Sequence, residues 1–202
     1  MKIGIISGSH RSPSQSDKVA NYINGCLADS HTETWQYSLA NNPLPLWDQS
    51  IWENDPAWVE RLTPIKKSLT ECDGFIIISP EWHGQVPSGL KNFFLLFSNK
   101  ELGHKPALLV SVSSGDGGAY PIAELRMSSY KNNRICYIPE QLILRHVESI
   151  LNENEENNNA KSHTYYQARI NWALDILIGY ANALKPMRET TQLFNDKFNN
   201  GM

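Results

Sequence analysis

A short segment near the amino terminus combines several hydroxyl groups with one positive charge. Residues 7–16 read S-G-S-H-R-S-P-S-Q-S, and a segment with helical periodicity follows them. The amino terminus of a helix has unpaired N–H groups and partial positive charge, so it attracts anions. The segment lacks both G-x-G-x-x-G and G-x-x-x-x-G-K-[ST], which argues against a dinucleotide pyrophosphate or a nucleoside triphosphate. A terminal monophosphate fits better, with Ser9, Arg11, Ser14 and Ser16 as its expected ligands; the alternative is an ordinary polar loop with Ser16 as a helix cap.

A second polar segment carries aromatic side chains and glycines. Residues 79–89 read S-P-E-W-H-G-Q-V-P-S-G. Glycine lets the backbone approach a ligand closely, while tryptophan and histidine supply flat surfaces and hydrogen-bonding edges. We therefore expect this segment to border a planar polar heterocycle. The residues predicted to contact it are Pro80, Glu81, Trp82, His83 and Gly84.

A third segment, residues 113–118, reads S-S-G-D-G-G and offers backbone groups in a flexible turn. Alone it is a weak signal, because a simple turn explains it equally well. We predict that Ser113, Gly115 and Gly118 contact the same ligand as the first two segments. A phosphate site and two backbone-rich loops together indicate a phosphorylated aromatic cofactor, and flavin mononucleotide (FMN) is the foremost candidate.

Alternating strands and helices are expected to bring the three segments together. Short β-branched runs alternate with longer helix-period segments, which is typical of a parallel sheet covered on both faces. Strands are predicted at 2–7, 32–38, 74–79, 107–112 and 135–144, and helices from Ser16 or Asp17 to Leu27 and at about 55–72, 87–99, 118–131 and 163–184. In such doubly wound α/β sandwiches, ligands bind beyond the carboxyl ends of the strands. The three polar segments follow the first, third and fourth strands, so they should meet at one edge.

The pattern also predicts the domain organisation. Residues 1–187 form one domain, and 188–202 form a polar tail that the core does not need. Pro64 is expected to kink its helix, and the acidic, Asn-rich segment 152–161 is expected to be a mobile surface loop. In the helix after Pro87, the apolar residues Phe93 to Phe97 point around the whole circumference. One face can cover the sheet while another needs a partner, so we predict a homodimer.

Composition excludes several functional classes. The chain has 202 residues, 18 Lys and Arg against 21 Asp and Glu, a net charge of -3 and a pI near 6.1, so it has no general field to attract nucleic acid or anionic lipid. The sequence shows neither a membrane span nor a secretory signal, and we expect a soluble cytoplasmic protein. The three cysteines and six histidines lack the spacing of disulfide frameworks or metal sites, and the cysteines are expected to be buried. The sequence contains no G-x-S-x-G motif, which argues against a serine hydrolase.

At the three segments the chain resembles the NAD(P)H-dependent FMN reductase family of the flavodoxin-like superfamily. The family's first loop, G-S-x-R followed by serines, is matched by Gly8, Ser9, Arg11, Ser14 and Ser16, and its second loop, P-E-Y-N-G-x-x-P-G-x-L-K-N, by Pro80, Glu81, Gly84, Pro87, Gly89, Leu90, Lys91 and Asn92. Its L-P-L-[YF]-[DN] segment looks like residues 44–48, and its G-G-x-R-A followed by L-R resembles Gly117-Gly118 with Leu125-Arg126. The resemblance implies a flavodoxin-like sheet of order 2-1-3-4-5, FMN held by all three loops, NADPH or NADH as co-substrate, and a homodimer or dimer of dimers.

The chain departs from the family pattern at three places. Trp82-His83 replaces a Tyr-Asn pair, so the flavin would face a bulkier wall. Tyr120 stands where an arginine is expected, and the preference between NADH and NADPH cannot be carried over. Arg126 could serve the nucleotide or a helix surface, and we favour the helix surface.

These features predict an FMN-dependent NAD(P)H oxidoreductase with ping-pong kinetics. The flavin carries the electron chemistry, so no catalytic side chain and no metal is expected; Trp82 and His83 should border the face where electrons are transferred. The acceptor could be free flavin, a quinone, an azo dye or an oxidised metal species. Trp47 and Trp52 could cover the flavin of a partner subunit, though core packing explains them nearly as well. The alternatives are an FMN-binding electron carrier or redox sensor, or a phosphate-binding interaction module without flavin.

Overall fold

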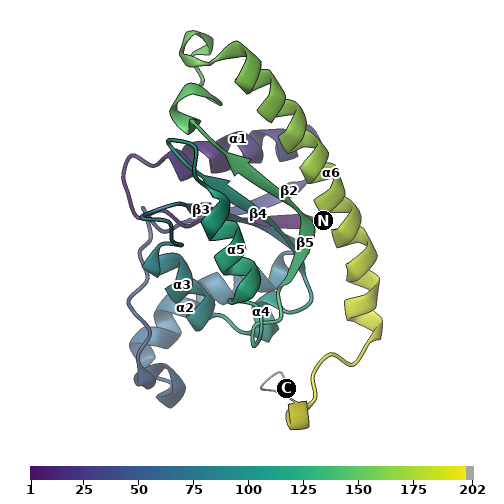
Figure 1. Cartoon of the computed structure of the whole chain (residues 1–202). Helices are drawn as coiled ribbons and strands as arrows, with labels where there is room; N and C mark the ends of the chain where they lie inside the picture. Colours follow the sequence, from purple (N-terminus) through teal and green to yellow (C-terminus); the bar gives the residue numbers. More distant parts are fainter. Residues whose placement is uncertain (199–202) are drawn as a thin grey trace.

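A computed structural model describes residues 1–198 as a parallel sheet between two layers of helices (Figure 1). The strands are β1 (Lys2–Ser7), β2 (Glu33–Ser38), β3 (Gly74–Pro80), β4 (Pro106–Val112) and β5 (Cys136–Leu144). All four pairings are parallel, and the order is β2-β1-β3-β4-β5. The predicted fold and strand order are confirmed. Each strand begins and ends within one residue of its predicted bounds.

Helices cover both faces of the sheet. Helices α1 (Gln15–Asp29) and α6 (Ala160–Thr190) lie on one face, and α2 (Pro56–Glu71), α3 (Ser88–Leu96), α4 (Asn99–Leu102) and α5 (Ala119–Met127) lie on the other (Figure 1). Short 3₁₀ segments occur at Gln49–Glu53, Val147–Ser149, Glu155–Asn157 and Asp196–Phe198. Helix α2 continues through Pro64, which is exposed. Across residues 1–198 we find no helix with the length and apolarity that crossing a bilayer requires.

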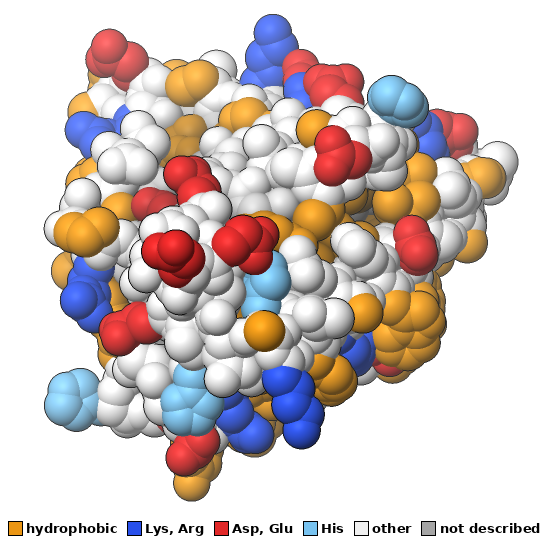
Figure 2. Space-filling view, turned by 90° about the horizontal axis from the view of Figure 1, so that it is seen from above, with side chains coloured by type: hydrophobic (Ala, Val, Ile, Leu, Met, Phe, Trp, Pro, Cys, Tyr) orange, Lys and Arg blue, Asp and Glu red, His pale blue; other side chains and the backbone are white. Residues whose placement is uncertain are grey.

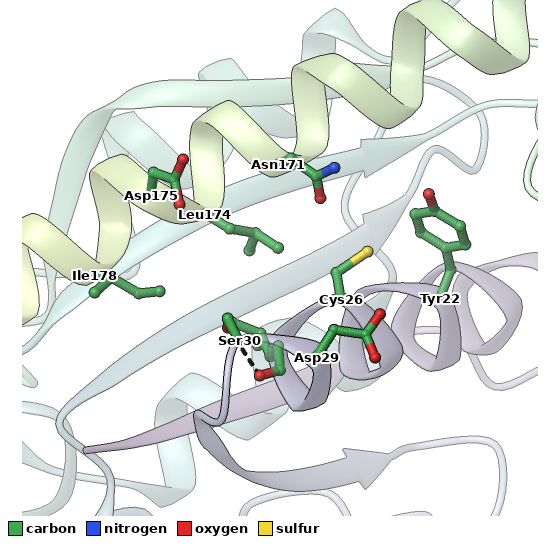
Figure 3. A pocket seen from close by; sticks show the side chains of 9 residues that line it. Tyr22, Cys26, Asp29, Ser30, Asn171, Leu174, Asp175 and Ile178 are labelled. Carbon is green, nitrogen blue, oxygen red and sulfur yellow. Dashed lines mark hydrogen bonds between the residues drawn. The ribbon is translucent and has the colours of Figure 1, made fainter.

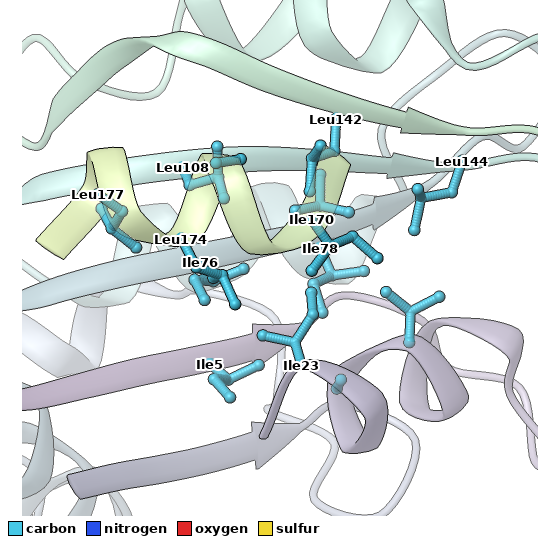
Figure 4. Packing of buried hydrophobic residues seen from close by; sticks show 14 of the residues in the cluster. Ile5, Ile23, Ile76, Ile78, Leu108, Leu142, Leu144, Ile170, Leu174 and Leu177 are labelled. Atoms are coloured by element: carbon cyan, nitrogen blue, oxygen red, sulfur yellow. The ribbon is translucent and has the colours of Figure 1, made fainter. Parts of the chain in front are cut away.

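Two apolar clusters hold the layers together. On one face, Ile23 of α1 and Leu174 of α6 pack against Ile5, Ile76 and Leu108 of the sheet (Figure 4). The other cluster joins aromatic and aliphatic side chains of α2, α3 and α5 to the opposite face. Every residue of β3 is buried, as expected of a central strand covered on both sides. The carboxyl ends of β1, β3 and β4 are therefore neighbours at one edge.

Helix α3 is shorter than predicted because a second helix begins at once. Ser98 Oγ accepts a hydrogen bond from the Lys100 N–H, and Glu101 Oε2 accepts one from the Ser98 N–H. This reciprocal capping box starts α4 and ends α3 at Leu96.

The structure also changes the argument for a dimer. Four of the five apolar side chains between Phe93 and Phe97 are buried inside the chain, and only Leu95, at 66% exposure, faces outward.

The Asn-rich segment 152–161 lies at the surface as predicted, and its mobility stays a prediction, but the segment is held by hydrogen bonds. Asn152 and Asn158 hydrogen-bond each other through side chain and backbone, and Asn159 caps α6 by accepting from the Ser162 N–H. The Lys18 ammonium donates to the carbonyl oxygens of Val147 and Ile150 and to Asn152 Oδ1. Asparagine side chains substitute here for backbone partners, so a segment without periodicity is nevertheless organised.

The last helix extends beyond its predicted end at Leu184. It continues through Pro186 to Thr190, and Lys185 and Arg188 lie 3.2 Å and 3.5 Å from the Asp73 carboxylate. The division into a domain of residues 1–187 and a tail of residues 188–202 stays a prediction. Its proposed boundary falls inside α6, and residues 199–202 lie outside the described part of the chain.

The cysteines are free thiols in different surroundings. Cys72 is buried as predicted, Cys26 is half-buried, and Cys136 is exposed, so the expectation that all three are buried is wrong. Cys136 is the first residue of an edge strand, where one side lacks a neighbouring strand.

Lys105 is a buried cation that caps a helix. Its ammonium donates to the carbonyl oxygens of Leu69 and Thr70 at the end of α2, at 2.7 Å and 2.9 Å. The Phe75 ring centre lies 5.5 Å away. Burial lowers the Lys105 pKa to about 8. The fold therefore holds a charge that water would stabilise better.

This predicts a pH dependence of stability. Between the folded pKa of about 8 and the ordinary value of 10.5, the unfolded chain binds more protons than the folded one. The Lys105 contribution to the free energy of unfolding should therefore rise with pH across this window, by about 3 kcal/mol. Urea unfolding should show that the free energy of unfolding of the wild type, relative to that of Lys105→Met, increases as the pH rises. The exposed Lys67→Met is the control, and a difference that stays constant for Lys105→Met would contradict the assignment.

Candidate cofactor site

The first loop lies between β1 and α1, as predicted. Ser14 caps α1, its Oγ accepting from the Asp17 N–H at 3.2 Å. Ser9 is buried, and its Oγ accepts from the Arg11 N–H at 3.2 Å. Both hydroxyls keep a hydrogen that they can still donate. Two of the predicted ligands thus shape the loop itself.

The other two predicted ligands of this loop lack partners. Ser16 is 1% exposed, and within residues 1–198 nothing hydrogen-bonds its Oγ. The Arg11 side chain is exposed, and its guanidinium makes no hydrogen bond or ion pair in this part of the chain. A buried hydroxyl without a partner is costly, because the group lost its water on folding. With the free N–H groups of the helix terminus, these side chains can receive an anion.

The second loop turns tightly just beyond Pro80, the buried last residue of β3. Trp82 and Gln85 exchange two backbone hydrogen bonds, of 3.1 Å and 2.9 Å. The two residues between them, His83 and Gly84, have φ values of +49° and +71°. This is the signature of a type I′ turn, which glycine and asparagine enter more readily than histidine. The His83 ring is therefore presented at the exposed tip of the loop.

A histidine that the sequence reasoning missed joins the first and second loops. A Cβ atom on Gly89 would lie 1.8 Å from His10 Nε2, so the imidazole fills the space that this glycine leaves open. The His10 and Trp82 ring centres are 6.1 Å apart. The glycine in the P-x-G segment at residues 87–89 was the available signal, since it required a close neighbour.

The third loop is bound to the second by a carboxylate. Glu81 Oε2 accepts a hydrogen bond from the Gly118 N–H, at the amino terminus of α5. A negative charge is stabilised at that position by the helix dipole. Gly118 has φ of +101°, and a Cβ there would lie 2.5 Å from Ile143 Cγ2. Glu81 was predicted to contact the ligand; in the structure one oxygen joins the two loops.

The chain after β5 supports the third loop from its other side. The Ser113 N–H donates to Leu144 O, and the His146 N–H donates to Gly115 O. Arg145 Nε donates to Gly117 O at 2.9 Å. The loop is therefore held at both ends, while Gly115 has open space where a Cβ would lie.

Helix α5 also supports the second loop. Glu124 accepts from the Val86 N–H at 2.8 Å and forms an ion pair with Lys91 of α3. Burial opposes ionisation of Glu124, but these two partners together lower its pKa. Arg126 donates to Gln141 Oε1 and to the carbonyl of Ile138, so it joins α5 to β5, and the choice between a surface role and a nucleotide role stays a prediction.

A hollow of about 430 Å³ lies between α1 and α6, where Tyr22 and Cys26 face Asn171 and Asp175 (Figure 3); it lies away from the three loops. Residues 1–198 contain no group of three His, Cys, Asp or Glu residues arranged to hold a metal ion. On the face in Figure 2, Lys and Arg side chains are scattered, and Asp and Glu side chains lie among them both near the middle and at the margins.

Comparisons with known proteins identify the family of this chain. The sequence model of the family described as NADPH-dependent FMN reductase matches residues 1–149, which confirms the resemblance. An NADPH azoreductase of Bacillus sp. strain OY1-2 is 31% identical over 144 residues, which is 71% of this chain and 76% of that protein. A quinone reductase of Escherichia coli K12 is 35% identical over 82 residues, which is 38% of this chain and 42% of that protein.

The fold is shared with solved flavoenzymes. The flavoenzyme FerB from Paracoccus denitrificans, an NAD(P)H:acceptor oxidoreductase, superposes with a TM-score of 0.70 at 18% identity. The alignment covers 91% of this chain and 98% of FerB. At this identity the likeness concerns the fold alone.

The third loop should tolerate alanine at one glycine and reject it at another. Gly118→Ala places a Cβ atom on a residue with a left-handed backbone conformation and against Ile143. The free energy of unfolding should therefore fall by about 2–4 kcal/mol. Gly115→Ala meets no atom within 4 Å and is the matched control, with an expected effect below about 1 kcal/mol. Urea unfolding measures both. Equal effects of the two variants would show that the loop conformation is not the one described.

Proposed function

The chain belongs to the NADPH-dependent FMN reductase family, and on this premise we propose that its three loops hold FMN and that electrons pass from NAD(P)H to a small acceptor by a ping-pong route. Membership of this family means that the protein is an oxidoreductase that uses FMN together with a nicotinamide nucleotide. The residues in contact with FMN, the order of events and the acceptor are parts of the proposal. The single observation that carries it is the set of unpartnered donors at the start of α1.

Those donors fit the phosphate of FMN. Ser16 supplies a buried hydroxyl without a partner, and Arg11 supplies a free guanidinium that can bind phosphate through two parallel N–H groups. Ser9 and Ser14 can donate their remaining hydroxyl hydrogens. The N–H groups of the first turn of α1 complete the cradle and place partial positive charge beside the phosphate.

The second and third loops fit the flavin ring. Among residues 1–198, the backbone groups of His83 and Gly84 and the N–H groups of Ser114, Asp116 and Gly117 keep their hydrogen-bonding capacity, while Glu81 and Arg145 fix the loops through neighbouring groups. When bound, FMN supplies two-electron transfer between donor and acceptor. The protein orients the ring, offers hydrogen bonds to its edge and excludes water from one face. Trp82 and His83, with His10 beside them, should border the open face.

One open face leads to ping-pong kinetics. A nicotinamide must approach the ring to about 3–3.5 Å in an aligned geometry, so donor and acceptor occupy the same place in turn. No side chain is needed as a nucleophile or as a permanent proton donor. The relatives named NADPH azoreductase and quinone reductase support azo compounds and quinones as acceptors of this protein.

We keep the homodimer and the cytoplasmic location as parts of the proposal. The dimer is now supported by exposed apolar side chains, since Leu46, Trp52 and Leu95 are 72%, 74% and 66% exposed. Asn92 of α3 donates to Pro45 O at 2.7 Å, so the segment with Leu46 lies against that helix. Trp47 and Trp52, with ring centres 4.9 Å apart, could then cover a partner's flavin. Sedimentation as a monomer at micromolar concentration would contradict the dimer.

Removing the free guanidinium should weaken FMN binding without unfolding the protein. Arg11→Ala removes a charge-assisted contact worth about 1.5–3 kcal/mol, so the FMN dissociation constant should rise roughly ten- to a hundredfold. Quenching of FMN fluorescence measures the affinity, and Arg61→Ala, an exposed arginine on α2, is the control. An unchanged affinity in Arg11→Ala would place the phosphate elsewhere.

Anaerobic mixing tests the reaction directly. NADPH or NADH should bleach the flavin absorbance of the loaded protein within seconds to minutes, and a quinone or azo dye should restore it. His83→Asn should change the rate or the acceptor preference more than the FMN affinity, because asparagine keeps the left-handed turn but shortens the side chain. If the flavin binds but neither nucleotide bleaches it, the protein is a carrier or sensor. If the protein binds no FMN, the interaction-module alternative replaces both.

A further inference from the structure

A second hollow, of about 320 Å³, lies between β5 and the first part of α6. It is lined by Gln141, Leu142, Ile143, Arg145, Tyr165, Tyr166 and Arg169. Two guanidinium groups and two phenol rings thus surround one small volume at the edge of the sheet. The function derived above uses none of these side chains except Arg145, which supports the third loop.

Arg169 brings an unsatisfied donor to this hollow. Its Nη2 donates to Glu140 Oε2 and to Gln141 O, and its guanidinium carbon lies 4.7 Å from the centre of the Trp172 ring. These contacts fix the plane of the guanidinium. Its Nη1 is buried and has no hydrogen-bond partner within the described residues. A buried guanidinium nitrogen without an acceptor is costly unless a ligand supplies one.

The hollow adjoins the third loop of the cofactor site. Arg145 donates through Nε to Gly117 O, and its two terminal nitrogens have no partner in residues 1–198. Ile143, which lines the hollow, is the side chain that a Cβ on Gly118 would strike. Arg145 and Ile143 therefore connect the hollow to the loop in which we place the flavin edge.

The charge and shape of the hollow favour one ligand chemistry. Glu140 offsets one of the two guanidinium charges, which leaves a net positive charge for an anion. Guanidinium groups bind phosphate through paired N–H groups. Tyr165 is 62% exposed, and its ring meets Tyr166 edge-on at 5.3 Å, so one ring face is open to stack on an aromatic base. A phosphomonoester attached close to a purine fits both features.

We propose that Arg169 and Arg145 bind the 2′-phosphate of NADPH, with the adenine against Tyr165. This inference rests on the proposed function, because it assigns the far end of the nucleotide whose nicotinamide reduces the flavin. NADH lacks only that phosphate, so this hollow would distinguish the two nucleotides. The third loop then contacts the flavin on one side and the adenosine end of NADPH on the other.

Titration calorimetry on the FMN-loaded protein tests the site without turnover. The probes are 2′,5′-ADP, which carries the 2′-phosphate, 5′-AMP, which lacks it, and inorganic phosphate. We expect the wild type to bind 2′,5′-ADP roughly ten- to a hundredfold more tightly than 5′-AMP. Arg169→Gln and Arg145→Gln should remove this difference, whereas Arg61→Gln on α2 should keep it. Arg169→Gln also removes the ion-pair partner of Glu140. The conservative variant Arg169→Lys keeps a positive charge beside Glu140 and is therefore the comparison for effects on folding.

Kinetics separate this proposal from the proposed function. Arg169→Gln should raise the KM for NADPH roughly tenfold or more, with kcat, the KM for NADH and the FMN affinity unchanged. Equal wild-type affinities for 2′,5′-ADP and 5′-AMP, or equal use of NADPH and NADH by a protein that binds FMN, would overturn the assignment alone. Inorganic phosphate binding as tightly as 2′,5′-ADP would also overturn it. Failure to bind FMN, or to be reduced by either nucleotide, would instead contradict the proposed function.

Discussion

The Glu81 carboxylate holds two ligand-facing loops in one frame. It leaves the end of β3 and accepts the N–H group that begins α5, where the helix dipole stabilises a negative charge. Without that acceptor the Gly118 N–H would be half-buried and unpaired, and the third loop would lose its connection to the second. The His10 ring against Gly89 plays the same part between the first loop and α3. A site built from loops can hold a flat cofactor only if such contacts set the loops relative to one another.

Most of the fold could be predicted from the sequence because its pattern is strong. Strand β3 reads as an unbroken apolar run, and the three polar segments follow β1, β3 and β4, which the parallel order brings to one edge. The hydrogen bonds that organise the Asn-rich segment could not be predicted, because they come from side-chain amides and from Lys18, a residue far away in the chain. Helix α6 is longer at both ends than the predicted range 163–184. Its last turn is held by Arg188 and Lys185 on Asp73.

The candidate site was predictable in its parts but not in its connections. Residue type and spacing identified Ser16 and Arg11, which the structure leaves without partners. Sequence patterns could not show that His10 fills the space over Gly89, or that Arg145 reaches Gly117, because both contacts join segments that no local periodicity relates. The dimer argument failed in the same way. An apolar helix looks identical in sequence whether its second face meets a partner or, as with Phe93 and Phe97, its own chain.

The central claim is that the first turn of α1 holds the phosphate of FMN. Riboflavin has the same ring and lacks only that phosphate, so comparing the two ligands on the unaltered protein isolates the contribution of the cradle. Fluorescence titration under identical conditions should show FMN binding roughly a hundredfold or more tightly than riboflavin, because the phosphate meets an arginine, a buried hydroxyl and free helix N–H groups together. Equal affinities for FMN and riboflavin would contradict the account.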